Sequence, residues 1–168
     1  NGDATVTSSG ATATLLPFGV LASGTPKVLA QQLSVSTNAV NGFAVTVFQN
    51  GDLLSDTTAD INLFKDGAAT AVPTAWTAPL ATLGTFDTYG HYGITSEDSD
   101  LNGNEFGAAL YAGNIATARQ VFSHDGPSDG LTADIGRTRV GIKIQVSDLQ
   151  EAADDYRNII TYVATPTF

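Results

Sequence analysis

The sequence predicts an all-β protein, an antiparallel β-sandwich of jelly-roll or immunoglobulin-like type with long loops and little helix. Three observations support this fold class. Apolar and polar residues alternate in several short runs, which is the periodicity of β-strands. Turn-forming pairs such as Asn41-Gly42 separate the runs. Between them, no stretch of useful length has the 3.6-residue periodicity of an amphipathic helix, so alternating strands and helices are not expected.

The first expected strand covers residues 4–16, where small or apolar residues alternate with threonine around a break at Gly10. The whole chain has 168 residues, the usual length of one domain. We therefore expect one sandwich domain, residues 17–168, preceded by an N-terminal strand, residues 1–16.

The next two expected strands, residues 27–37 and 43–49, flank Asn41-Gly42 and are predicted to form a hairpin. Residues 43–49 carry apolar side chains on both faces, so we expect a central strand covered on both sides. Residues 53–64 are expected to be a loop with one helical turn capped by Asp60.

A long crossover without periodicity, residues 68–88, is expected to be held in place by Trp76. The strand that follows, residues 89–95, carries aromatic residues that we place at a surface or an edge.

The strands expected in the second half are residues 119–123, 137–146 and 158–164. Residues 137–146 have the clearest alternation, with one face in the core and one outward. Residues 148–155 should form a turn that pairs this strand with residues 158–164.

Charge and composition exclude several classes of function. Seven Lys and Arg residues stand against 17 Asp and Glu, which gives a net charge of −10. A phosphate backbone would be repelled, so nucleic acid is not an expected partner. No cysteine is available for a disulfide or a thiol nucleophile, and no run of eighteen apolar residues predicts a membrane span.

The first residue, Asn1, and the composition together suggest secretion. The chain does not begin with methionine, and only 14% of its residues are charged. We expect a mature extracellular or cell-surface protein whose signal peptide has been removed, with a trimmed sequence as the alternative.

The closing part of the chain resembles a known type of hairpin. Around Leu149, Tyr156, Ile160 and Tyr162 it is similar to the end of immunoglobulin-like bacterial surface domains. The resemblance implies that Tyr156 is a tyrosine corner. The segments around Pro17-Phe18-Gly19 and at the end of the chain also resemble secreted prokaryotic surface proteins.

In overall architecture the chain resembles donor-strand-exchanged filament proteins, whose subunits place an N-terminal strand in a groove of the next subunit. Small side chains at alternate positions, Ala4, Val6, Ser8 and Gly10, would suit such an intersubunit strand. The alternative is that residues 4–16 form an ordinary first strand of their own sheet.

A candidate calcium site lies in one acidic loop. Oxygen-bearing side chains recur there at alternate positions, with a glycine that allows a sharp turn. The candidate ligands are Asp98, Asp100, Asn102, Asn104 and Glu105. The twelfth position is Ala109 instead of glutamate, which rules out an EF-hand, and a solvated acidic loop is the alternative.

Other combinations of reactive residues are weaker candidates. Asp125, Asp129 and Asp134 lie beside turn glycines and are interpreted as plain turns. The consecutive residues Ser123-His124-Asp125 cannot form a hydrolase triad, because neighbours on a strand point in opposite directions. His91 could pair with Asp87 in principle, but we expect it to be packed or at the surface.

The aromatic residues Trp76, Phe86, Tyr89 and Tyr92 either fill the core beneath the crossover or form a sugar-stacking platform. The function predicted first is a non-catalytic subunit of an extracellular filament, pilus-like fibre or surface layer, a homopolymer that calcium stabilises. The alternative is a monomeric β-sandwich module that binds carbohydrate or a host surface, with glycans as partners.

Overall fold

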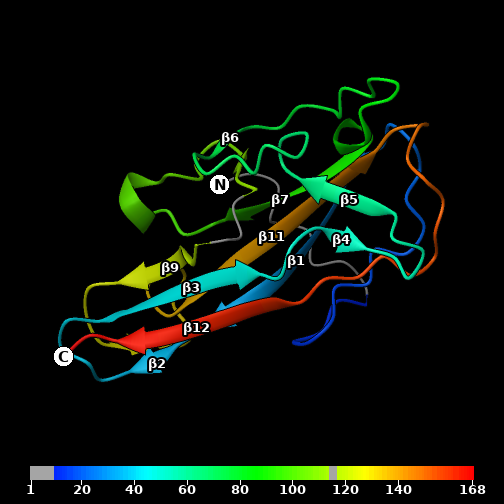
Figure 1. Ribbon diagram of the computed structural model, residues 1–168. Coiled ribbons are helices and arrows are strands. Elements are labelled where there is room, and N and C mark those ends of the chain that lie inside the picture. The colour runs from blue at the N-terminus through cyan, green and yellow to red at the C-terminus, as the bar shows by residue number, and fades with distance from the viewer. Residues whose placement is uncertain (1–9, 114–116) are drawn as a thin grey trace.

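The computed structural model describes residues 10–113 and 117–168 and confirms the all-β prediction (Figure 1). Its strands are β1 (Lys27–Ser34), β2 (Ser36–Thr37), β3 (Phe43–Gln49), β4 (Leu53–Leu54), β5 (Asp60–Leu63), β6 (Thr74–Ala75), β7 (Gly90–Ser96), β8 (Leu110–Tyr111), β9 (Arg119–His124), β10 (Ser128–Asp129), β11 (Arg137–Val146) and β12 (Ile160–Pro166). Two short 3₁₀ helices, η2 (Phe86–Thr88) and η3 (Leu101–Gly103), are the only helices in these ranges.

Two main sheets form a sandwich-like arrangement (Figure 1). The larger has the order β1-β11-β7-β5-β4, and the smaller has the order β12-β3-β9. Two ladders of two residues each, β10-β2 and β6-β8, lie outside them. One part of the prediction is wrong, because β5 pairs with β7 in parallel, with Asn62 opposite His91.

The core lies between the two main sheets and is built from alternate residues of their strands. Phe43 of β3 meets Phe122 of β9 edge to face, with ring centroids 4.9 Å apart. The buried core side chains are Phe43, Val45, Val47, Ile61, Leu63, Tyr92, Ile94, Leu101, Phe106, Ala112, Val121, Phe122, Val140, Ile142, Ile144 and Val146. The alternation that predicted strands therefore also placed most of the core.

The predicted hairpin of β1 and β3 is wrong, because these strands belong to different sheets. β1 pairs with β11 over eight residues, and β3 pairs with β12 over seven. The turn itself exists, since the Gly42 amide donates to the Ala39 carbonyl at 3.1 Å. It carries the chain from one layer to the other, where each strand pairs with segments from the second half of the chain.

The predicted pairing of residues 137–146 with 158–164 is wrong for the same reason. β11 lies between β1 and β7 in the larger sheet, whereas β12 pairs with β3 in the smaller one. The connection between them contains Tyr156, whose hydroxyl donates to the Glu151 carbonyl at 2.6 Å. This backward hydrogen bond has the form expected of a tyrosine corner.

Two local predictions also fail. Residues 10–16 do not continue a strand, because the Thr12 amide donates to the Leu15 carbonyl at 2.9 Å and closes a tight turn. Asp60 does not cap a helical turn; it opens β5, where β-branched Ile61 and its neighbours are buried between the layers.

The outer face of the larger sheet is covered, contrary to expectation. Phe64, Trp76 and Tyr111 pack together on this face beside His91. Every residue of β7 is buried and the strand lies between β11 and β5, so β7 is not an edge strand. On β11, Gly141 and Gln145 of the supposedly outward face are buried too. β3 is central as predicted, but Ala44, Thr46 and Phe48 on its outer face are only half-buried.

Candidate functional site

β12 and β9 are the two outer strands of the smaller sheet (Figure 1). On β9 the Val121 carbonyl and the Ser123 amide are bonded to the side chains of Ser96 and Asp98, so the edge of β12 is the candidate for binding another strand. In the described part of the chain, β12 pairs with β3 on one side and with no strand on the other. The Thr167 amide donates to the Gly42 carbonyl at 2.8 Å, which fixes the phase of the ladder. Because bonded and non-bonded pairs alternate in an antiparallel ladder, Thr161, Val163 and Thr165 direct their backbone groups toward β3.

The same alternation leaves the backbone groups of Ile160, Tyr162 and Ala164 directed at the open edge. The strand has no charged residue from Ile160 to Pro166. Natural sheets usually protect such edges with lysine, proline, bulges or covering segments. Among the described residues, the only one of these features at β12 is Pro166, at the last position of the strand. Its edge is therefore suited to receive another strand.

Two further features of β12 accompany the open edge. Val163 is 43% exposed on the outer face of the smaller sheet. The Tyr162 hydroxyl is buried and has no hydrogen-bond partner in the described ranges. Burial raises the pKa of Tyr162 to about 12, so this hydroxyl stays a neutral donor at physiological pH.

The proposed intersubunit strand is only partly visible. Ala4, Val6 and Ser8 lie outside the described residues, so their assignment stays a prediction. Gly10 is exposed at a φ of +108°, and the Thr12 carbonyl accepts a hydrogen bond from the Gln31 side chain at 2.9 Å. The described chain thus begins beside β1.

The predicted calcium loop is arranged around a buried carboxylate. Asp98 is fully buried, and its two oxygens accept hydrogen bonds from the backbone amides of Asp100 at 3.1 Å and Ser123 at 2.9 Å. Burial raises the pKa of Asp98, while these two hydrogen bonds lower it. Asp98 therefore ties the loop to β9.

The remaining candidate ligands do not converge with Asp98. Asp100, Asn102 and Asn104 are exposed, and Asn102 donates to Glu105, which also pairs with Arg119 at 3.4 Å. Among the residues that the structure describes, no three His, Asp or Glu side chains gather closely enough to hold a metal ion. Calcium binding here stays a prediction.

The second acidic cluster contains the turn that its sequence indicated. Asp129 accepts hydrogen bonds from the backbone amides of Leu131 and Thr132, both at 2.8 Å, and from the Thr132 hydroxyl. The amides of Thr132 and Leu131 lower the pKa of Asp129 to about 2. Asp134 instead accepts a hydrogen bond from Ser99 at 2.8 Å.

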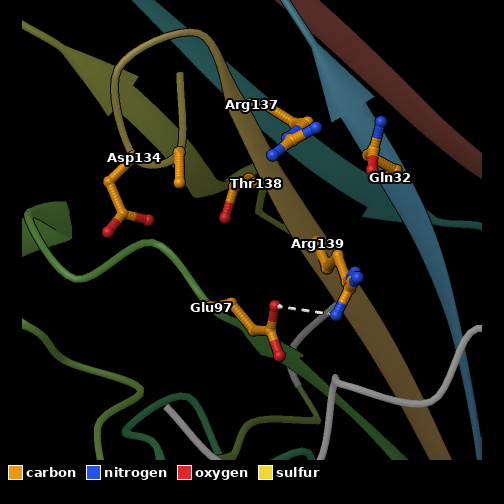
Figure 2. Close-up of a pocket in the computed structure, with 7 residues that line it drawn as sticks. Gln32, Glu97, Asp134, Arg137, Thr138 and Arg139 are labelled. Carbon is orange, nitrogen blue, oxygen red and sulfur yellow. Dashed lines mark ion pairs between the residues drawn. The ribbon is translucent and has the colours of Figure 1, made fainter. Parts of the chain in front are cut away.

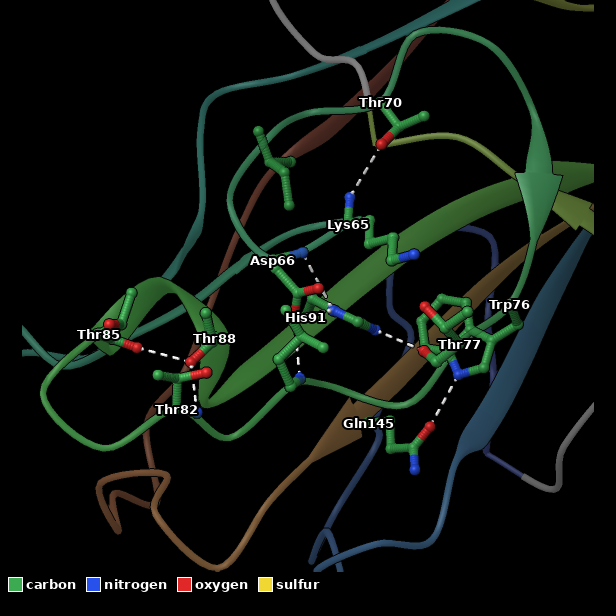
Figure 3. Close-up of polar contacts among 12 residues, drawn as sticks. Lys65, Asp66, Thr70, Trp76, Thr77, Thr82, Thr85, Thr88, His91 and Gln145 are labelled. Atoms are coloured by element: carbon green, nitrogen blue, oxygen red, sulfur yellow. Dashed lines mark hydrogen bonds and ion pairs between the residues drawn. The ribbon is translucent and has the colours of Figure 1, made fainter.

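His91 is packed, as expected, but its partner is Asp66 instead of Asp87 (Figure 3). The Asp66 amide donates to His91 Nδ1 at 3.2 Å, and Nε2 lies 2.9 Å from the Thr77 carbonyl. A neutral ring with its proton on Nε2 satisfies both contacts. Burial lowers the pKa of His91, although the Thr77 hydrogen bond and the Asp66 carboxylate raise it.

Trp76 holds the crossover on the sheet beside His91 (Figure 3). Its ring stacks on Phe64 with centroids 4.7 Å apart, and Nε1 donates to Gln145 at 2.8 Å. Because Gln145 belongs to β11 and Phe64 directly follows β5, both contacts tie Trp76 to the larger sheet. The Trp76 contacts therefore agree with the expected role of this residue in holding the crossover.

The aromatic residues do not form one platform. Tyr92 is buried in the core between the sheets, whereas His91 and Trp76 lie on the opposite face of the larger sheet. Phe86 is 72% exposed and contacts only Tyr89 within this group, with centroids 5.5 Å apart. The predicted sugar-stacking surface is therefore wrong for this set of residues.

Sequence reasoning missed a polar cavity of about 420 Å³. Its lining residues are Gln32, Glu97, Ala133, Asp134, Arg137, Thr138 and Arg139. They come from β1, β11 and two loops that are far apart in the sequence, so no local motif could reveal it. The one signal in the sequence was the pair Arg137 and Arg139, which lie close together in a chain that has only seven Lys and Arg residues.

No helix in the described part of the chain is long and apolar enough to cross a membrane. Comparisons with protein-family models, with curated proteins and with solved structures find no match to the chain.

Proposed function

We propose that this protein is a non-catalytic structural subunit of an extracellular filament, pilus-like fibre or surface layer, a homopolymer that assembles by β-strand complementation. The observation that carries the proposal is the open, uncharged edge of β12. A strand from a second copy would continue the smaller sheet at this edge, and backbone hydrogen bonds would supply most of the affinity.

The donor in this proposal is the N-terminal segment with Ala4, Val6, Ser8 and Gly10. Small side chains at alternate positions allow such a strand to approach β12 closely, while the exposed Val163 offers an apolar contact on the outer face. A head-to-tail contact of this kind does not use the same surface twice, so it extends into a fibre instead of closing as a dimer.

The two histidines support a structural role over a hydrolytic one. His91 is fully buried, and both of its ring nitrogens are engaged by the crossover. His124 follows Ser123 on β9, and adjacent strand residues point to opposite faces. Neither arrangement offers a base in hydrogen-bonding reach of an exposed nucleophile.

The substitution Ala164→Pro tests the edge. The Ala164 amide faces away from β3, and proline is tolerated in an edge strand where its missing N–H would face solvent. We expect the variant to stay folded, with a melting temperature within a few degrees of the parent, and to lose polymerisation in negative-stain images.

Ala164→Ser is the matched control, because it keeps the amide and should polymerise normally. Deletion of residues 1–12 tests the donor separately and should also abolish fibres. Fibres of unchanged length and order from Ala164→Pro would exclude the β12 edge, and unchanged fibres from the deletion would exclude the donor strand.

A further inference from the structure

A polar cavity opens where β11 extends beyond its neighbour β7 (Figure 2). β7 ends at Ser96, which is paired with Val140, so no strand within the described ranges lies beside residues 137–139 of β11 on that side. Only the isolated bridge of Arg137 with Ala133 continues there. The loop before β11 turns back there, because the Asp134 amide donates to the Arg137 carbonyl at 2.9 Å. The resulting hollow has a volume of about 420 Å³.

The walls of this cavity are polar and oppositely charged. Among the described residues that line it, Ala133 is the only apolar one, so the specific contacts to a ligand would come from polar and charged groups. Two of the four arginines in the chain line it, together with the carboxylates of Glu97 and Asp134. Arg139 pairs with Glu97 across 3.8 Å, whereas the exposed Arg137 has no ion pair within the described ranges.

A buried hydroxyl in the wall lacks a partner. Thr138 is 5% exposed, and its Oγ1 makes no hydrogen bond to any residue that the structure describes. Figure 2 shows this hydroxyl directed toward the space between Asp134 and Glu97. Because unsatisfied buried polar atoms are rare in folded proteins, a ligand hydroxyl is a physical explanation for this one.

We propose that the cavity binds an acidic saccharide through one uronic acid unit. The carboxylate of the sugar would pair with the Arg137 guanidinium, which is shaped for planar, bidentate recognition of carboxylates. The ring hydroxyls would bond to Glu97 and Gln32 on the face of β11 that carries Arg137. They would reach Asp134 and Thr138 across the edge of β11, where β7 has already ended. A uronic acid unit carries one negative charge and several hydroxyl groups. The lining residues offer a guanidinium to the charge, and carboxylate, amide and hydroxyl groups to the hydroxyls.

The chemistry of the lining residues distinguishes this ligand from two others. A phosphate group carries more negative charge and would be repelled by the two carboxylates in the wall. A neutral sugar could use the same hydroxyl contacts but would leave Arg137 without a counterion. Binding does not require polymerisation, so this inference stands apart from the proposed assembly.

The direct test is titration of the ¹⁵N-labelled full chain with a galacturonic acid trimer, followed by NMR shifts. We expect saturable shifts at residues 97, 134 and 137–139, and markedly weaker binding of a neutral galactose trimer and of inorganic phosphate. Arg137→Gln should weaken binding by roughly 10-fold or more, the usual effect of losing a charge-assisted hydrogen bond.

Arg157→Gln is the matched control, because Arg157 is exposed, pairs with Asp56 and does not line the cavity. Thr138→Val keeps the side-chain shape and should weaken binding several-fold without loss of stability. Three results would each overturn the proposal. The first is equal affinity of the parent and Arg137→Gln, and the second is equal affinity for acidic and neutral sugars. The third is the absence of shifts at roughly 10 mM ligand, which is about ten times the concentration that half-saturates a weak site with a Kd of about 1 mM.

Discussion

His91 shows how a single side chain can be fixed by contacts that no local pattern reveals. The ring is fully buried on β7, and its partners, Asp66 and Thr77, both come from the crossover. Alternation along the strand predicted that His91 would share a face with Gly93 and Thr95. It could not predict that this face is covered, because the covering segment lacks periodicity.

The lowered pKa of His91 predicts a specific dependence of stability on pH. The unfolded chain takes up a proton near the usual pKa of 6.5, whereas the folded chain binds it only at lower pH. Between these two pKa values the unfolded state binds more protons, so the free energy of unfolding falls as the pH is lowered. Above 6.5 this contribution is fully present.

Urea unfolding at pH 8 and pH 5 measures the effect. The contribution of His91 is smaller at pH 5 than at pH 8, so over this interval the parent should lose more stability, or gain less, than His91→Gln. His124→Gln is the control, since His124 is not part of this network. An identical pH dependence in the parent and in His91→Gln would contradict the assignment.

At the scale of elements, the strands were largely predictable and their partners were not. Residues 43–49 and 137–146 are strands because period-two alternation places one row of apolar side chains in the core. Which strand lies beside which depends on the direction of turns such as Ala39–Gly42, and on partners more than one hundred residues away. The asparagine–glycine pair correctly marked a turn but did not determine its geometry.

Gly42 is the residue that this turn depends on. It has a φ of +76°, and a Cβ added there would lie 1.6 Å from the His124 carbonyl oxygen. Gly42→Ala must therefore move the turn away from β9 as well as strain the backbone. We expect a loss of more than about 2 kcal/mol in the free energy of unfolding, which urea denaturation measures.

Gly84 provides the comparison, since it has a φ of +85° and nothing within 4 Å of the position that an added Cβ would take. Gly84→Ala carries only the backbone cost, roughly 1 kcal/mol. Equal losses in the two variants would show that the close approach to His124 does not constrain the turn.

Across the whole molecule, negative charge opposes self-association while the β12 edge favours it. Copies with a net charge of −10 repel one another over the Debye length, which shrinks from about 30 Å at 0.01 M salt to about 8 Å at 0.15 M. Composition alone predicted this repulsion. Composition could not predict the open edge of β12. That edge results from the pairing of β12 with β3, whereas the sequence predicted a pairing with β11.

Raising the salt concentration over that range should therefore accelerate polymerisation, as followed by light scattering. Ala164→Pro should scatter no more at high salt than at low salt, because screening does not restore the missing amide. Faster scattering of both proteins in parallel would indicate nonspecific aggregation and would contradict assembly through the edge.

The position of β11 has a consequence for how the chain acquires its structure. The strand that joins β1 to β7 in the larger sheet is Arg137–Val146, and one of the two partners of β3 in the smaller sheet is Ile160–Pro166. Because the chain is synthesised from its N-terminus, neither sheet can be completed until these two late segments have been made. The earlier part of the chain therefore cannot reach the native arrangement of either sheet before the last strands are available.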